Sequence, residues 1–171
     1  MKGMKKMPRS GGKNEKNRFC KLYFIVLTLV ILACDQFSKS WIMRQFDPGE
    51  SLPLINGLFH LTFVKNPGAA FGILAFRTSF FIIVSLLMIF LIIFGGRFFP
   101  QENFLRLSMA LLLGGAVGNL IDRMRYGYVV DFLDFRIWPV FNIADISLVV
   151  GIFFFIYALY KNRFFLNNNG L

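Results

Sequence analysis

The sequence predicts an all-α membrane protein with four transmembrane helices and a small extracytoplasmic β element in the first outer loop. Three observations support this fold class. The chain of 171 residues is 56% hydrophobic and contains 23 Phe residues, and its mean hydropathy is +0.60. Four stretches approach the ~20 apolar residues that a helix needs to cross the ~30 Å hydrocarbon core. The Lys and Arg residues are concentrated in segments that four spans would place on one side.

The predicted spans follow one another along the chain as four apolar stretches. Their approximate bounds are Leu22–Met43, Ser79–Gly96, Phe104–Leu120 and Phe141–Tyr160. The second is uninterrupted, whereas the other three reach full length only by including polar residues at one end. In the third, Gly114 and Gly118 lie four residues apart. Small residues at this spacing let neighbouring helices pack closely.

The basic residues predict the orientation. Eight Lys and Arg residues precede the first span, Arg97 and Arg106 lie around the loop between spans two and three, and Lys161 and Arg163 follow the fourth. By the positive-inside rule both termini are cytoplasmic. Residues 1–21 are then a basic cytoplasmic extension, 22–163 the transmembrane domain and 164–171 a cytoplasmic tail. Phe19 is the only aromatic residue of the extension, which leaves no series of interleaved aromatic residues on which bases could stack, so nucleic-acid binding is not expected.

The first outer loop, from Arg44 to Phe71, contains a hairpin signal. Asn56 and Gly57 lie between apolar runs rich in strand-forming residues, and Asn-Gly favours the tight turn of a β-hairpin. We therefore expect two short strands at the membrane surface. The loop ends in the sequence KNPGAAFG, in which Asn66 and the small residues after it suit a tight turn.

Polar residues gather at one depth, at the outer ends of the predicted spans. Asp35 lies ~20 Å from the cytoplasmic face, at 1.5 Å per residue. The other members are Lys39 in span one, Asn119, Asp122 and Arg123 at the end of span three, Asn142 and Asp145 at the start of span four, and Asp131 in the outer loop between them. Ionisable residues within a membrane are costly, so this convergence indicates a functional site.

Helical spacing groups these residues further. Asn119, Asp122 and Arg123 share one helix face. Asn142 and Asp145 share another, and Asp35 with Lys39 has the order and spacing of an ion pair. We expect Asp134 to be a solvated or ion-paired loop residue.

The residue types restrict the chemistry to carboxylates. The chain has one His (His60) and two Cys, which favours neither a Ser-His-Asp triad nor a protein-built zinc site. No metal or other cofactor is predicted. Two close Asp residues do not both ionise cheaply, so one keeps a proton. The ionised member can activate water while the protonated one polarises a carbonyl, which hydrolyses a peptide bond without a covalent intermediate.

Five blocks occur in an order that resembles the lipoprotein signal peptidase (signal peptidase II) family. They are DQFSK from Asp35, KNPGAAFG from Lys65, GGAVGNLIDR from Gly114, VVDFLDF from Val129 and FNIAD from Phe141. The resemblance implies an aspartyl protease of the bacterial inner membrane with its site at the outer face. It implies that the enzyme cleaves prolipoproteins before a diacylglyceryl-modified Cys, as a monomer among membrane lipids.

The resemblance also implies roles for individual residues. Asp131 and Asp145 would be the catalytic pair. The residues that would position the pair and the substrate are Asn119, Arg123 and Asn142, and those that would shape the site are Asp35, Lys39, Asn66 and Asp122. Only 13 residues separate Asp131 from Asp145, and the sequence alone predicts neither the conformation of this connection nor which Asp holds the proton.

Two other classes of protein remain open at this stage. A proton-coupled transporter or channel subunit also carries membrane carboxylates, but here the polar groups do not continue into the cytoplasmic half. A non-enzymatic membrane scaffold would not need several carboxylates at one depth. An Asp131→Asn substitution would separate these classes, because a scaffold should tolerate it.

Overall fold

The computed structural model describes residues 11–68, 78–96 and 103–168, and the side chains of residues 21–68, 78–96 and 103–161 among them. Several expectations lie outside the described residues. These are the first ten residues of the basic extension, the small residues at 69–72, Arg97 and the end of the C-terminal tail.

Four helices follow the predicted spans. They are α1 (Gly11–Gln45), α2 (Thr78–Phe90), α3 (Asn103–Tyr126) and α4 (Ile143–Asn168), and α2 continues as a turn of π-helix, η2 (Leu91–Gly95). All four are long and apolar enough to cross a membrane, over 21–45, 78–95, 103–126 and 143–161. The prediction of four transmembrane helices is therefore confirmed. α1 and α3 extend past the predicted bounds at both ends, most of all α1, which begins in the basic extension. α4 begins two residues later than predicted and ends eight residues later, and α2 with η2 is shifted by one residue.

The β element is a three-stranded antiparallel sheet in the order β1-β2-β3. β1 (Ser51–Ile55) and β2 (Phe59–Asn66) form the predicted hairpin, and Gly57 in its turn has φ +72°, a conformation that glycine adopts without steric cost. The third strand, β3 (Val129–Asp134), comes from the loop between α3 and α4. Asp131 therefore lies between the third and fourth spans as predicted, but in a strand that the sequence did not predict.

Asp134 also differs from expectation. It is ion-paired with Arg136 at 3.1 Å, as one alternative predicted, but it lies at the end of β3 and is only 5% exposed. The physical reason is that β3 is covered on both faces, so five of its six residues are buried. A strand buried on both faces shows an apolar run instead of alternation, so this segment carries no period-two pattern that would predict a strand.

α3 is the central helix. It contacts α1, α2, α4 and β3, and most of its span is buried, whereas less than a quarter of each of the other three spans is buried. Its glycines permit this packing. A Cβ on Gly114 would lie 2.8 Å from Ile31 Cγ2 of α1, and one on Gly115 would lie 2.6 Å from the Ala144 carbonyl oxygen of α4. The predicted close helix packing is confirmed at Gly114.

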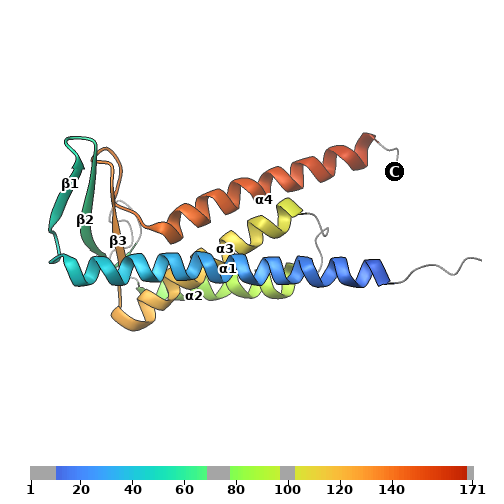
Figure 1. Ribbon diagram of the computed structural model, residues 1–171, viewed down its shortest axis with the longest axis horizontal. Helices are drawn as coiled ribbons and strands as arrows, with labels where there is room; N and C mark the ends of the chain where they lie inside the picture. The colour runs from blue at the N-terminus through green and yellow to red at the C-terminus, as the bar shows by residue number, and fades with distance from the viewer. Residues whose placement is uncertain (1–10, 69–77, 97–102, 169–171) are drawn as a thin grey trace, which may run out of the picture.

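Figure 1 shows where this packing places the sheet. The three strands lie together at one end of the molecule, beside the C-terminal end of α1 and the N-terminal end of α4. The start of α1 and the end of α4 lie at the opposite end. The polar ends of three helices therefore meet next to the sheet.

Candidate functional site

Asp131 is held by strand register. It pairs with Val64 of β2, so the side chain two residues along, that of Asn66, is its diagonal neighbour on the same face. Asn66 Nδ2 donates to Asp131 Oδ2 at 2.7 Å. Asn66 Oδ1 accepts from the Gly68 backbone N–H at 3.0 Å, which fixes the orientation of the amide. Asp131 is 1% exposed.

Asp145 is held by the start of α4. Asn142 immediately precedes the helix, and its Oδ1 accepts from the Asp145 backbone N–H at 2.9 Å. In return the Asn142 backbone N–H donates to Asp145 Oδ2 at 3.2 Å. This reciprocal arrangement is a capping box, with Asn and Asp in place of the usual Ser/Thr and Glu. The first turn of the helix is also a favourable place for a negative charge.

Two buried amides connect the aspartates. Asn142 Nδ2 donates to Asp131 Oδ1 at 2.7 Å and to Asn119 Oδ1 at 3.2 Å. Asn119 Nδ2 donates to Asp145 Oδ1 at 2.8 Å. Each amide oxygen faces a group that can only donate, so neither amide can be reversed without losing a bond. With the bonds from Asn66 to Asp131 and from the Asn142 backbone N–H to Asp145, each carboxylate oxygen accepts one hydrogen bond.

The buried ammonium group of Lys39 contacts the Asn119 amide and helps to hold it in place. Lys39 is 1% exposed, and its Nζ lies 2.9 Å from Asp35 Oδ2 and 3.0 Å from Asp122 Oδ2. The predicted Asp35–Lys39 ion pair is thus present. The third Lys39 contact is a hydrogen bond to Asn119 Oδ1 at 2.9 Å, so all three donors of the ammonium are satisfied.

The two carboxylates beside Lys39 also join separate elements. Asp35 Oδ1 accepts from the Ala144 backbone N–H at 2.9 Å, which ties α1 to the start of α4. Asp122 Oδ2 accepts from the Val130 backbone N–H at 3.1 Å, which ties α3 to β3. Removing one partner from such a buried network leaves an uncompensated charge, which costs about 3–5 kcal/mol.

Gln36 was missed by the sequence reasoning. Its Nε2 lies 2.9 Å from Asp122 Oδ1 and 3.2 Å from both Asp35 Oδ2 and the Gly118 carbonyl oxygen. Its position inside an apolar span, next to Asp35, was a usable signal. Gly118 permits this contact because a Cβ there would lie 2.5 Å from Asp35 Oδ2.

Arg123 lies on the side of the site that faces α2. Its Nη1 donates to the Asn119 carbonyl oxygen at 3.4 Å, and the guanidinium lies 5.1 Å from the centre of the Phe81 ring. Its Nε is buried without a hydrogen-bond partner among the described residues. The structure thus brings all nine predicted site residues together from α1, α3, α4, β2, β3 and the N-cap of α4.

A polar pocket of about 190 Å³ gives access to both aspartates. Its walls include Asn66, Asn119, Arg123, Asp131 and Asp145. Burial, and then the nearby Asp145 carboxylate, raise the pKa of Asp131 to about 7, while the hydrogen bonds from Asn66 and Asn142 oppose the shift. A carboxyl group of this kind can keep its proton at neutral pH. Among the described residues no group of three His, Cys, Asp or Glu could hold a metal ion.

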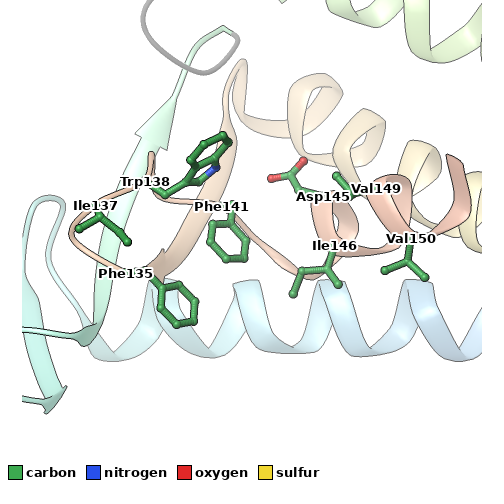
Figure 2. Close-up of a pocket in the computed structure, with 8 residues that line it drawn as sticks. All are labelled: Phe135, Ile137, Trp138, Phe141, Asp145, Ile146, Val149 and Val150. Carbon is green, nitrogen blue, oxygen red and sulfur yellow. The ribbon is translucent and has the colours of Figure 1, made fainter. Parts of the chain in front are cut away.

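An apolar pocket of about 540 Å³ adjoins the polar one. Figure 2 shows its lining, which comes from the connection between β3 and α4 and from the first turns of α4. The lining residues are Phe135, Ile137, Trp138, Phe141, Asp145, Ile146, Val149 and Val150. Three of them, Trp138, Phe141 and Asp145, also line the polar pocket. The connection whose conformation the sequence did not predict thus forms a wall of both pockets.

Comparison with known proteins assigns the arrangement to a family. Residues 27–161 match the peptidase family described as Signal peptidase (SPase) II. A lipoprotein signal peptidase of Moorella thermoacetica is 57% identical over 130 residues, which cover 75% of this chain and 87% of that relative. A lipoprotein signal peptidase of Halothermothrix orenii is 48% identical over 143 residues, which cover 83% and 97%.

A solved structure has a similar fold. It is described as a bacterial membrane enzyme determined by the in meso method at 2.3 Å resolution, with a TM-score of 0.76 and 34% identity over 82% of this chain and 89% of that one. The relatives are peptidases, which contradicts the alternatives of a transporter or a scaffold. The chain, a multi-pass membrane protein, belongs to the signal peptidase II family of aspartic peptidases.

Proposed function

We propose that Asp131 and Asp145 are the catalytic aspartate pair of this peptidase. The observation that carries the proposal is that the two carboxylates line one pocket and accept hydrogen bonds from the same residue, Asn142, whose side-chain amide donates to Asp131 and whose backbone N–H donates to Asp145. They differ in surroundings. Asp145 lies in the first turn of α4, whereas Asp131 is 1% exposed in a strand. The raised pKa of Asp131, about 7, supports a resting state in which the pair holds one proton, and we place that proton on Asp131, the more deeply buried of the two.

The reaction then follows from the two protonation states. The Asp145 carboxylate takes a proton from a water molecule as that water attacks the carbonyl carbon of the scissile bond. The Asp131 carboxyl group donates a hydrogen bond to the carbonyl oxygen, which becomes negatively charged in the transition state. Asp145 then passes the proton that it took from water to the leaving nitrogen, and the C–N bond breaks to give a carboxylic acid and an amine, without a covalent intermediate on the enzyme.

The remaining site residues position this pair. Asn66, Asn119 and Asn142 donate one hydrogen bond to each carboxylate oxygen of the pair, and each oxygen keeps a lone pair for water or substrate. Lys39, with Asp35 and Asp122, fixes the Asn119 amide and the elements that carry Val130 and Ala144. Arg123 provides a positive charge at the wall of the polar pocket for substrate backbone oxygens.

The names of the relatives support a lipoprotein substrate. We propose that the enzyme removes signal peptides from prolipoproteins and cleaves before the diacylglyceryl-modified Cys. The lipid chains of such a precursor stay in the outer leaflet, so the scissile bond lies at the membrane surface. The aspartate pair is at the sheet end of the helices, where it meets that bond without extraction of the lipid.

The pH dependence of cleavage tests the role of Asp131. If its protonated form is required, kcat/KM falls as pH rises through about 7, the pKa of Asp131. The hydrogen bond from Asn66 stabilises the ionised form, so Asn66→Ala raises this pKa and moves the alkaline limb to higher pH. The measurement is kcat/KM on a lipidated precursor in detergent from pH 5 to 9. An alkaline limb that stays in place in Asn66→Ala contradicts the assignment of the proton to Asp131.

The membrane topology is a separate proposal. We propose that both termini are cytoplasmic in the bacterial inner membrane, with residues 1–21 as a basic extension, 22–163 as the peptidase domain and 164–171 as a tail. The eight Lys and Arg residues of the basic extension support this orientation. The start of α1 and the end of α4 also lie at the end of the molecule opposite the sheet (Figure 1).

A reporter fusion tests this orientation. A C-terminal reporter that is active only in the cytoplasm is expected to be active, and one that is active only outside the membrane to be silent. Fusion of the same reporters after Gly57, in the hairpin turn, is the matched control and should give the reverse pattern. Activity of the external reporter at the C-terminus would invert the placement of the site.

A further inference from the structure

The apolar pocket takes no part in the chemistry described above. It nevertheless adjoins the polar pocket, because Trp138, Phe141 and Asp145 line both. Only Trp138 and Asp145 among its eight lining side chains carry a polar group. Ile137 is 90% exposed and Trp138 60% exposed, so the described part of the chain leaves this lining largely uncovered.

The pocket extends along α4 away from the aspartate pair. Asp145, Ile146, Val149 and Val150 fall on one side of the helix, at spacings of one, four and five residues. Five residues span about 7.5 Å of helix axis. Figure 2 shows the same progression, with the Asp145 carboxylate near Trp138 and Val149 and Val150 further along α4. Because α4 is a membrane span, the pocket descends from the site into the apolar layer.

We propose that the apolar pocket holds an acyl chain of the substrate's diacylglyceryl group while the scissile bond lies in the polar pocket. This inference rests on the proposed function. The modified Cys follows the scissile bond directly, so its lipid begins next to Asp145. A chain that leaves this point toward the membrane interior passes the described lining.

The chemistry of the lining favours an acyl chain over peptide. Residues beside a bond that is being cleaved are extended, so their backbone N–H and C=O groups need partners outside their own segment. In an apolar site each unpaired group is costly, and two polar side chains cannot satisfy an extended segment. An acyl chain has no such groups.

Binding of the acyl chain in the pocket is expected to improve the position of the scissile bond and not the affinity of the enzyme for its substrate. An acyl chain in the bilayer is already surrounded by apolar groups, so moving it into the pocket gains little free energy. A chain held along Ile146 and Val149 fixes the height and rotation of the modified Cys relative to Asp131 and Asp145. Since a misplacement of ~1 Å can cost ~100-fold in rate, the effect should fall on kcat and leave KM nearly unchanged.

The experiment fills the pocket and varies the chain. Val149 is 53% exposed, so Val149→Phe adds bulk to the pocket without disturbing a buried contact. Matched precursors carry either palmitoyl or butyryl chains on the glyceryl group. For the palmitoyl precursor Val149→Phe should lower kcat by roughly 10- to 100-fold, the scale of a misplaced reacting bond. For the butyryl precursor kcat should stay close to that of the unsubstituted enzyme.

The control is Ile152→Phe, on the same helix with 47% exposure and outside the lining of the pocket; it should leave both rates unchanged. Equal loss for both precursors in Val149→Phe overturns the acyl-chain assignment. So does a loss that follows the size of the residue before the Cys, which would assign the pocket to peptide. If the proposed function itself is wrong, the unsubstituted enzyme will cleave neither precursor. This result differs from those that overturn only the assignment of the pocket.

Discussion

Asp131→Asn and Asp145→Asn are each expected to abolish cleavage of a lipidated precursor. An amide is neither an acid nor a base, and general acid–base catalysis contributes about 10²–10⁴-fold to rate. Asn has nearly the same shape as Asp, so the variants should insert into the membrane and fold. The measurement is single-turnover cleavage by purified enzyme, with membrane insertion checked by the reporter fusions described above.

Asp134→Asn is the matched control for this experiment. It makes the same chemical change three residues from Asp131 in the same strand. Asp134 bonds to Thr62 at 2.8 Å and to Arg136, and it is absent from the lining of the polar pocket. Cleavage by this variant should therefore persist. Near-normal turnover by Asp131→Asn or Asp145→Asn would remove that residue from the catalytic pair.

Precursors whose lipobox Cys carries no diacylglyceryl group are expected to be cleaved at least ~100-fold more slowly than their lipidated counterparts. Each buried CH₂ of an acyl chain contributes about 0.8 kcal/mol to membrane binding, so two chains anchor the Cys firmly at the outer interface. The aspartate pair lies at one depth, next to the sheet. Without the anchor the scissile bond reaches that depth less often and less accurately, and a ~1 Å error can cost ~100-fold.

The comparison uses purified enzyme in lipid with matched precursors that differ only in the diacylglyceryl group. A second pair, with the lipobox Cys replaced by Ser, reports any cleavage that does not depend on the lipid. Equal kcat/KM for lipidated and unlipidated precursors would refute the requirement. It would instead indicate an intramembrane aspartyl protease that accepts unmodified peptides.

The sequence by itself determined the elements whose signals are local. Four apolar stretches predicted four helices, and Asn56-Gly57 predicted the hairpin between β1 and β2. The i, i+4 spacing of Asp35 and Lys39 predicted their ion pair. Such signals depend on residues within a few positions of one another, so they can be read without knowledge of the remaining chain. The polar residues at one depth also predicted the location of the candidate site.

Only the tertiary structure decided how these residues meet. The pairing of β3 with β2 places Asp131 opposite Val64, and no local pattern in an apolar run that contains two Asp residues indicates a strand. Gln36 joins Asp35 and Asp122 because α1 packs against the glycine face of α3. The 13 residues between Asp131 and Asp145 contribute a wall to both pockets, and this too depends on neighbours that are distant in sequence. Hydrogen-bond partners and packing neighbours distant in sequence satisfy these groups, so their positions depend on the complete fold.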